Sequence, residues 1–325
     1  MHALAEIVRF PLAKPFAITG YTFNDTETLR VSLTSEGVIG RGESVGTYYL
    51  GETAESMLAD FSAVADGLDS GIDRLALQEM MPPGGARNAI DCALWDLECK
   101  VAGLAIWQLL NIVPKPLVTV FTLGIGEADE MAQAASEAIA FPHLKIKLSN
   151  EKPVERLEAI RQARPDAQLV VDVNQGWSFD ELKEYDPYFQ GLGVAMIEQP
   201  LARGNDEVLE TYRSKVPLGA DESCLHLEEF EAARRRYQVL NIKLDKCGGL
   251  TEGLALVRLA QEAGMALMVG NMMGSSLSMA PSFVIGQHCR FVDIDGPLLL
   301  AGDIENGLNY HSAGLVDPPE SALWG

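Results

Sequence analysis

Residues 168–200 read "QLVVDVNQGWSFDELKEYDPYFQGLGVAMIEQP", and this stretch decides the fold. It begins with a short apolar run, "QLVVDVN", and it ends with another, "VAMIEQP". The residues between them form an amphipathic stretch at helical spacing. A strand, a helix and a second strand in this order predict two parallel strands joined by a helical crossover.

The same alternation extends over most of the chain beyond residue 112. The apolar runs are "LVTVFTLG", "LKIKL", "QLVVDVN", "VAMIEQP", "LGADES", "LNIKLDK", "LMVGNM" and "RFVDIDG". Eight such units in succession predict an α/β protein with a closed (β/α)8-type barrel. An open doubly wound sheet is the alternative, but it would normally carry a glycine-rich phosphate loop after its first strand. The stretch "TLGIGEADE" is a weak match to that loop.

The first part of the chain has a different pattern. A strand-like "LAEIVRF" precedes "TLRVSLTSEGVIGRGE", which we interpret as a hairpin that turns at "SEG". The segment "ARNAIDCALWDLECKVAGLAIWQLL" is helical in pattern, and "NIVPKP" ends it. We therefore expect an α+β domain over residues 1–112, a barrel over 113–308, and a C-terminal segment, 309–325, that returns to the first domain.

Composition excludes several classes of function. The 325-residue chain has 46 acidic and 25 basic residues, so its net charge of -21 would repel nucleic acids and anionic membranes. No apolar run approaches the roughly 20 residues of a membrane span, and "MHALAEIVRF" does not resemble a signal peptide. Five cysteines without a CxxC pair favour reduced, buried thiols. These features predict a cytoplasmic protein with a small-molecule substrate.

Charged residues stand at or near the ends of the apolar runs. Taken in chain order from Lys147 to Asp293, six such residues are separated by 25, 26, 23, 25 and 47 positions, and the last spacing is about two repeats. An acid at a strand end often caps a helix or faces water. Three acids on consecutive strands, with a lysine on the strand before and after them, instead favour one site at the barrel mouth. The residues are Lys147, Asp172, Glu198, Asp221, Lys246 and Asp293.

Three convergent carboxylates without histidine or thiolate form a hard-oxygen site that suits Mg²⁺. In "LKIKL", residues 144–148, Lys145 and Lys147 share one face of the strand. That pattern alone also suits an exposed edge strand. Inside a barrel mouth, one ammonium beside another disfavours the charged form, so we expect a lysine that can act as a base.

The motifs together resemble the enolase superfamily, and within it the muconate-lactonizing subgroup. They are "KIK", "VDVNQGW", "IEQP", "ADES" and "KLDKCGG", and the first 112 residues resemble the capping domain of that family. The resemblance implies that Asp172, Glu198 and Asp221 bind Mg²⁺. It implies that Lys147 and Lys246 are the acid/base pair on opposite faces of the substrate α-carbon. Lys145 and Lys243 would tune the pKa of the catalytic groups or bind a carboxylate. Asn174 and Glu222 would orient the metal ligands.

The last apolar run narrows the choice within the subgroup. In "VDIDG", Asp293 and Asp295 share one face of the strand. This pair is similar to that of the dipeptide epimerases, where it binds the substrate α-ammonium, and a buried cation does need paired anions. The alternative is an exposed acidic turn before "GP". The implied activity is epimerisation of a dipeptide at its second residue, most often in L-Ala-D/L-Glu.

One loop departs from the family pattern. In "KPFAITGYTF", Thr19 and Gly20 stand where the Ala-Glu enzymes carry an arginine that reaches the glutamate side chain. Either Lys14 or a barrel residue replaces that arginine, or the second residue is apolar or cationic. For an apolar residue, "NMMGSS" offers Met272 and Met273 as a soft pocket wall, and the alternative is that these methionines belong to the core. Met272 and Ser275 are the candidate substrate contacts in this stretch.

The sequence is also compatible with other functions. A cycloisomerase, an o-succinylbenzoate synthase or an N-acylamino-acid racemase of the same subgroup would share the acids and lysines. A Schiff-base aldolase and a catalytically silent barrel are further alternatives. The sequence does not identify the second residue, the lysine that acts on each epimer, or the pathway. A homo-oligomer is an expectation from the family resemblance alone.

Overall fold

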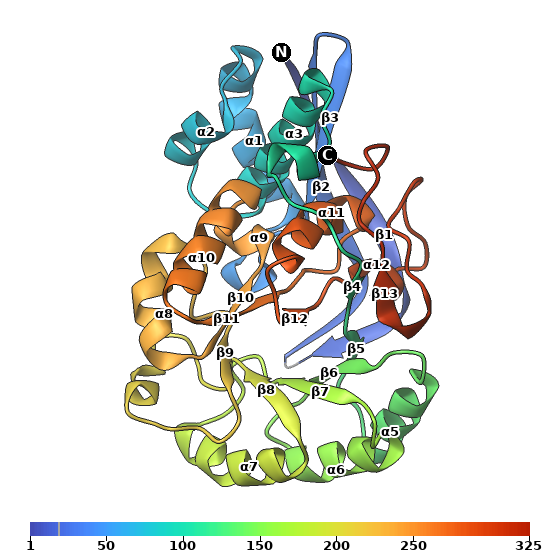
Figure 1. Ribbon diagram of the computed structural model, residues 1–325, viewed down its shortest axis with the longest axis vertical. Helices are drawn as coiled ribbons and strands as arrows, with labels where there is room; N and C mark the ends of the chain where they lie inside the picture. Colours follow the sequence, from blue (N-terminus) through green and yellow to red (C-terminus); the bar gives the residue numbers. More distant parts are fainter. Residues whose placement is uncertain (19) are drawn as a thin grey trace.

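The computed structural model describes residues 1–18 and 20–325. The N-terminal part is a three-stranded antiparallel sheet in the order β1-β2-β3, with helices packed on one face (Figure 1). Its elements are β1 (His2–Ile18), β2 (Tyr21–Ser35), β3 (Val38–Ser44), a 3-10 turn η1 (Tyr48–Leu50), α1 (Ala54–Asp69), α2 (Arg74–Met80), α3 (Gly85–Ala102) and α4 (Ile106–Leu109).

Helix α3 packs closely on β3 because two glycines allow it. A Cβ built on Gly42 would lie 2.1 Å from the carbonyl oxygen of Ala89, and one on Gly40 would lie 2.3 Å from that of Ala93. Hydrophobic side chains of β2 and α1 complete this smaller core, among them Leu29, Val31 and Met57.

The second part is an eight-stranded parallel sheet in the order β12-β11-β10-β9-β8-β7-β6-β5. The strands are β5 (Phe121–Leu123), β6 (His143–Lys147), β7 (Gln168–Asp172), β8 (Val194–Glu198), β9 (Leu218–Ala220), β10 (Val239–Ile242), β11 (Ala266–Val269) and β12 (Phe291–Val292). The sheet curls so that its two edges meet, and Val120 N–H donates to the carbonyl of Val292 at 2.8 Å. The predicted barrel is confirmed.

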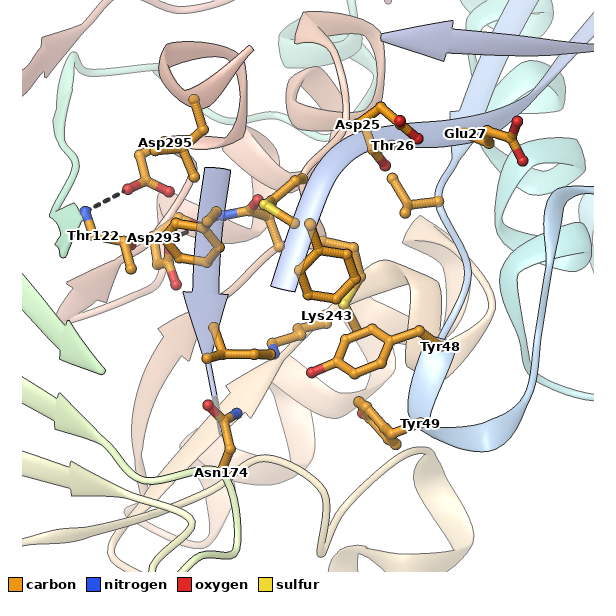
Figure 2. A pocket seen from close by; sticks show the side chains of 18 of the residues that line it. Asp25, Thr26, Glu27, Tyr48, Tyr49, Thr122, Asn174, Lys243, Asp293 and Asp295 are labelled. Atoms are coloured by element: carbon orange, nitrogen blue, oxygen red, sulfur yellow. Dashed lines mark hydrogen bonds between the residues drawn. The ribbon is translucent and has the colours of Figure 1, made fainter. Parts of the chain in front are cut away.

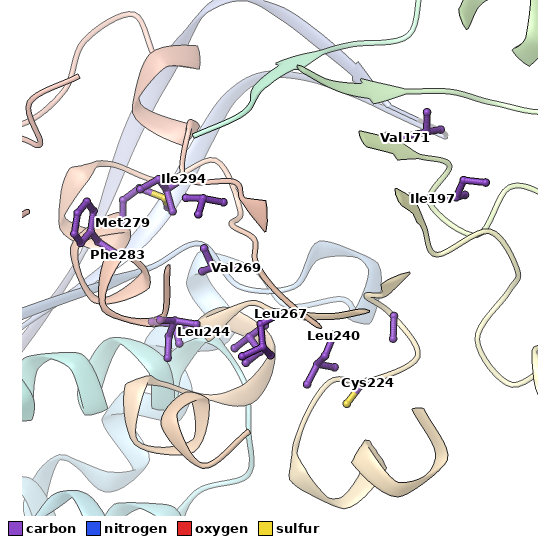
Figure 3. Close-up of a cluster of buried hydrophobic side chains, with 14 of the residues drawn as sticks. Val171, Ile197, Cys224, Leu240, Leu244, Leu267, Val269, Met279, Phe283 and Ile294 are labelled. Atoms are coloured by element: carbon purple, nitrogen blue, oxygen red, sulfur yellow. The ribbon is translucent and has the colours of Figure 1, made fainter. Parts of the chain in front are cut away.

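Helices surround this sheet, and their apolar faces pack against its outer side. The helices and 3-10 turns are α5 (Ala128–Glu137), α6 (Pro153–Ala163), α7 (Phe179–Gly191), η2 (Glu207–Glu210), η3 (Leu227–Glu229), α8 (Phe230–Arg236), α9 (Leu244–Cys247), α10 (Leu250–Glu262), α11 (Ser276–Gly286) and α12 (Gly296–Leu299). Figure 3 shows part of the resulting core, from Val171 and Ile197 to Leu267 and Phe283.

Strand alternation decides which side chains face the inside of the barrel. Val170 lies in a small interior cluster with Met196 and Phe291, whereas its neighbour Val171 packs outward into the large core. On β6 the same alternation sends Leu144, Ile146 and Leu148 outward into that core. Lys145 and Lys147 therefore face the interior.

The C-terminal segment contacts both parts of the molecule. After η4 (Ser312–Gly314), β13 (Leu315–Val316) pairs antiparallel with β4 (Leu117–Val118). The Trp324 indole N–H donates to Cys92 O at 2.9 Å, and Gly325 N–H donates to Asp96 Oδ1 at 2.7 Å. Both acceptors lie on α3, so the segment touches the N-terminal part. The domain boundary near residue 112 remains a proposal.

Two details of the fold differ from the sequence interpretation. The run "LVTVFTLG" forms two short strands, of which only β5 belongs to the barrel. Strand β1 is 17 residues long, so it continues well beyond "LAEIVRF". It forms a second hairpin with β2, whose last pair before the turn is Ile18 with Tyr21. Within the described residues, no helix is both long and apolar enough to cross a membrane.

Candidate active site

A pocket of about 240 Å³ lies at the carboxyl ends of the barrel strands, where the N-terminal part covers the mouth. Figure 2 shows Asp293, Asp295 and Thr122 on one side of it and Tyr48 and Tyr49 on the other. Barrel lysines and capping-domain aromatic residues thus share one cavity. This is the place where barrel enzymes build active sites.

The two lysines of β6 contact the predicted metal-ligand acids. Lys145 Nζ lies 2.8 Å from Asp293 Oδ2, 2.9 Å from Glu198 Oε2 and 3.1 Å from Asp172 Oδ2. Lys147 Nζ lies 2.7 Å from Asp172 Oδ2. Both lysines line the pocket and are almost fully buried.

The expected loss of charge on a β6 lysine is wrong for Lys145. Burial lowers its pKa, but the carboxylates of Asp293, Glu198 and Asp172 outweigh burial and hold the pKa well above its ordinary value. The effect of the neighbouring ammonium group is smaller than that of the acids. Three acids within ion-pair distance have the larger effect.

Asp172, Glu198 and Asp221 come together from neighbouring strands, and each is fully buried. Asp172 and Glu198 are paired in register across β7 and β8. The pKa of Asp172 is lowered to about 2, because the charges of Lys147 and Lys145 outweigh burial. Burial and the charge of Asp172 raise the pKa of Glu198 to about 7. The acids therefore depend on nearby cations to stay ionised together.

The structure separates the two lysines of "KLDKCGG". Lys243 lines the pocket, and its Nζ donates to Asp221 Oδ2 at 2.6 Å. Lys246 is not among the lining residues, and its Nζ donates to Asp221 Oδ1 and to three backbone carbonyls, those of Asp221, Cys224 and Asn241. With these acceptors, Lys246 holds the backbone after β9 and β10. The geometry favours Lys243, in place of Lys246, as the lysine that faces a substrate.

Asp293 and Asp295 both line the pocket, with 3% and 2% of their surfaces exposed. Asp295 Oδ2 accepts the Thr122 N–H at 2.7 Å, and Asp293 Oδ1 accepts from Asn271 Nδ2 at 2.9 Å. Burial and the charge of Asp293 raise the pKa of Asp295 to about 7. A cation between the two would remove this repulsion, so the pair is suited to an ammonium group. The exposed acidic turn is excluded.

Asn174 and Glu222 lie beside the acids. Asn174 Oδ1 accepts from Lys147 Nζ at 3.0 Å, and its N–H donates to Asp172 Oδ1 at 3.0 Å. Its side-chain amide contacts Glu222 Oε1 at 3.4 Å. Burial and the charge of Asp221 raise the pKa of Glu222 to about 8, and Glu222 Oε2 is buried without a hydrogen-bond partner.

Gln199, in the motif "IEQP", is a site residue that the sequence analysis does not predict, and it orders the backbone that carries Asp221. Its Oε1 accepts the N–H groups of Asp221 and Ser223 at 3.0 and 2.9 Å. Its Nε2 donates to Leu201 O and to Tyr237 Oη. Gln199 is fully buried and has a φ of 38°. The available signal in the sequence was an amide directly after the strand-end acid Glu198.

The two candidate substrate contacts of "NMMGSS" lie in different surroundings. Met272 lines the pocket, whereas Ser275 does not. The Ser275 hydroxyl accepts the Leu277 N–H at the start of α11, and its own N–H donates to Glu43 Oε1. Ser275 is therefore a helix cap, and its position gives no support to a substrate-binding role.

The capping loops meet above the pocket through aromatic rings. Tyr48 packs edge-on against Tyr21 and Phe23, with ring centroids 4.7 and 5.3 Å apart. Asp245 Oδ1 accepts from Ser44 Oγ at 2.6 Å and from Val45 N, which fixes the loop before η1 to the barrel. Thr19 lies outside the described residues, and Gly20 sits in the hairpin turn with a φ of 80°.

The fit of the three carboxylates to a metal ion follows from their position and their chemistry. In residues 1–18 and 20–325, no three histidine, cysteine, aspartate or glutamate side chains form a ready metal cluster. Lysine ammonium groups instead contact all three acids. Glu198 Oε2 lies 2.9 Å from Lys145 Nζ but outside hydrogen-bond geometry. Three hard-oxygen donors on neighbouring strand ends fit Mg²⁺, which would supply the positive charge that they require.

Comparisons with known proteins identify the family to which the chain belongs. Residues 127–298 match the model "Enolase C-terminal domain-like", and residues 3–111 match "Mandelate racemase / muconate lactonizing enzyme, N-terminal domain". The chain belongs to the enolase superfamily. A curated relative in this superfamily is the L-Ala-D/L-Glu epimerase of Escherichia coli K12. It is 39% identical over 93% of this chain and 95% of its own length.

Solved structures within the superfamily include liganded dipeptide epimerases. An enolase family member from Agrobacterium tumefaciens, with bound sodium and L-Ala-L-Glu, has a TM-score of 0.97 and 40% identity over 100% of this chain and 99% of its own. A dipeptide epimerase from Enterococcus faecalis V583, complexed with Mg and L-Leu-L-Tyr, has a TM-score of 0.92 and 26% identity. The alignment covers 98% of this chain and 97% of that one.

Proposed function

We propose that this protein is a Mg²⁺-dependent dipeptide epimerase that inverts the α-carbon of the second residue, with L-Ala-D/L-Glu as its first substrate. The observation that carries the proposal is the placement of two pocket-lining lysines on either side of three buried acids. Lys147 lies on β6 and Lys243 directly follows β10, with β7, β8 and β9 between those two strands.

This arrangement suits a proton transfer between opposite faces of one carbon. The Nζ of one lysine, in its neutral form, takes the α-proton, and the ammonium of the other lysine returns a proton to the opposite face. The α-carbon is thereby inverted. Our assignment is Lys147 and Lys243, with Lys246 holding Asp221 in place. It revises the sequence prediction of Lys147 and Lys246.

Asp172, Glu198 and Asp221 would hold Mg²⁺. When bound, the metal would neutralise the α-carboxylate of the substrate and so acidify the α-proton. Asp293 and Asp295 would hold the α-ammonium of the first residue, because both line the pocket next to Lys145. A cycloisomerase, an o-succinylbenzoate synthase or an N-acylamino-acid racemase has no need of two acids for an ammonium group.

Two observations bear on the second residue. The glutamate preference is supported by the relative from E. coli and by the dipeptide bound to the A. tumefaciens protein. The described capping-domain residues that line the pocket include Asp25 and Glu27 but no lysine or arginine. This wall favours an apolar or cationic second residue as the alternative. The buried Tyr49 hydroxyl has no hydrogen-bond partner and is a donor available to a substrate oxygen.

Proton NMR in D2O with Mg²⁺ tests the proposal. L-Ala-L-Glu is compared with L-Ala-L-Phe, L-Ala-L-Leu and L-Ala-L-Lys for loss of the α-proton signal of the second residue. Fastest exchange with L-Ala-L-Glu is expected. Faster exchange with another dipeptide would support the epimerase function but assign it a different second residue. No exchange with any dipeptide, in folded and metal-loaded protein, would overturn the proposal.

A further inference from the structure

A second cavity of about 810 Å³ adjoins the catalytic pocket. It lies between residues 13–17 of β1, the end of β5, and helix α5, and we call it the α5 pocket. Phe16, Thr122 and Leu299 line both cavities. The α5 pocket therefore lies directly against the site where the substrate is expected, with these three side chains between the two cavities.

The shared wall lies beside the acids proposed to hold the substrate ammonium. The backbone N–H of Thr122 donates to Asp295 Oδ2 at 2.7 Å, so Thr122 joins Asp295 to the wall of the α5 pocket. An ammonium at Asp293 and Asp295 places the first α-carbon of the dipeptide next to this wall. The substituent of that carbon is then the part of the substrate nearest to the α5 pocket.

A longer peptide would not use the cavity in the same way. Extension beyond the first residue converts the ammonium into a neutral amide. The buried carboxylates of Asp293 and Asp295, which are 3% and 2% exposed, would then lose their cation. The cavity is accordingly matched to a side chain of the first residue.

The lining of the α5 pocket is mainly apolar. Phe121 and Phe141 stack with ring centroids 4.6 Å apart, and Met131 and Ala134 of α5 add to the same cavity. Charged lining residues are exposed: Lys14, Glu130 and Glu137. Burial of a leucine or phenylalanine side chain would remove a large apolar surface from water, whereas an alanine methyl group is too short to fill such a cavity.

We propose that the α5 pocket binds the side chain of the first residue and that the enzyme accepts dipeptides with a large apolar first residue. The inference rests on the proposed epimerase function. It extends that function from the second residue, where the chemistry occurs, to the first.

The test holds the second residue constant and varies the first. The kcat/KM of L-Ala-L-Glu is compared with those of L-Leu-L-Glu and L-Phe-L-Glu, or with the same series on whichever second residue the wild-type enzyme prefers. The variant Ala134→Phe fills the α5 pocket. Ser136→Phe is the matched control, because Ser136 lies on α5, is exposed, and does not line either cavity.

We expect wild-type kcat/KM for the leucine and phenylalanine dipeptides to equal or exceed that for the alanine dipeptide. Ala134→Phe should lower the phenylalanine value about tenfold or more, with the alanine value changed by less than about threefold. Ser136→Phe should change neither. Turnover of alanine dipeptides alone, or an equal loss for all substrates in Ala134→Phe, would overturn the inference. No turnover of any dipeptide would instead overturn the proposed function.

Discussion

At the scale of single residues, a motif can indicate that a lysine is present in the site without indicating which of two lysines faces the substrate. Lys243 and Lys246 are three positions apart in "KLDKCGG", and both contact Asp221. Lys243 is still extended, with φ -117° and ψ 126°, and it directly precedes the short helix α9. Lys246 belongs to that helix. Strand alternation therefore applies to Lys243 and has ended before Lys246.

We predict different losses for the two lysines. Lys243→Met should reduce epimerisation by about a hundredfold or more, because general acid/base catalysis by one group is worth that much. Lys246→Met should mainly lower stability, because three carbonyls and Asp221 Oδ1 lose their donor. NMR exchange of each epimer and thermal unfolding measure the two effects. Full activity in folded Lys243→Met would refute the assignment.

Gln199 carries a second prediction at this scale. Gln199→Leu leaves the N–H groups of Asp221 and Ser223 without an acceptor, which should cost roughly 2–4 kcal/mol and weaken Mg²⁺ binding about tenfold. Gln238→Leu is the control, because Gln238 Oε1 accepts the Leu218 N–H at the other end of β9. Urea unfolding and titration with Mn²⁺ followed by electron paramagnetic resonance provide the readouts. Equal metal affinity in both variants would show that Gln199 is only structural.

Sequence reasoning located the site because its residues stand at a repeated position. Asp172, Glu198 and Asp221 each end a strand or directly follow one, so the repeat alone brought them together. The sequence pattern did not indicate the positions of Gln199 and Ser275 for a different reason. Their roles depend on the particular N–H groups that they face after the chain has left the strand. Periodicity does not encode those contacts.

At the scale of elements, the alternation of apolar runs predicted the barrel but not the way in which α3 joins it. Asp91, on α3, accepts the Thr251 N–H of α10 at 2.9 Å and the Gln78 amide of α2 at 3.1 Å. The first contact holds α3 against the barrel, and the second joins α3 to α2 within the capping domain. The residues of the first contact are 160 positions apart, so the local pattern does not connect them.

Asp91 gives these contacts a predictable pH dependence. Burial raises its pKa to about 6, above the value of the unfolded chain, so the folded state binds the proton more tightly. Stability should therefore fall as the pH rises through 6, and Asp91 should account for a loss of about 1 kcal/mol between pH 5 and pH 7. The free energy of unfolding in urea, measured for wild type and for Asp91→Asn between pH 5 and pH 7, isolates the contribution of Asp91. The variant should show a smaller loss, and parallel profiles would contradict the prediction.

The contact between β3 and α3 supplies a prediction on packing. Gly42→Ala places a Cβ 2.1 Å from Ala89 O, a backbone atom, so the helix must shift and stability should fall by about 2–3 kcal/mol. Gly191→Ala, at the end of α7, meets nothing within 4 Å and should be neutral or slightly stabilising. Thermal unfolding of both variants compares the two sites. Equal midpoints would mean that α3 adjusts without cost.

At the scale of the whole molecule, the fold collects negative charge at the barrel mouth of a chain that is already strongly acidic. The net charge is -21, and five buried carboxylates lie at or beneath the pocket: Asp172, Glu198, Asp221, Asp293 and Asp295. Lys145 contacts three of them. A divalent cation at the acids and an ammonium at the last pair would complete the neutralisation. Metal and substrate should therefore both stabilise the folded enzyme.

We predict that Mg²⁺ raises the thermal midpoint by a few degrees relative to EDTA, because a ligand at a hundred times its Kd stabilises the folded state by about 2.7 kcal/mol. Glu198→Gln should abolish this shift. It should not destabilise the metal-free form strongly, because burial and Asp172 already raise the pKa of Glu198 to about 7. Sodium chloride at matched ionic strength controls for screening of the net charge. If sodium chloride reproduces the shift, or if Glu198→Gln retains it, the three acids do not bind the metal.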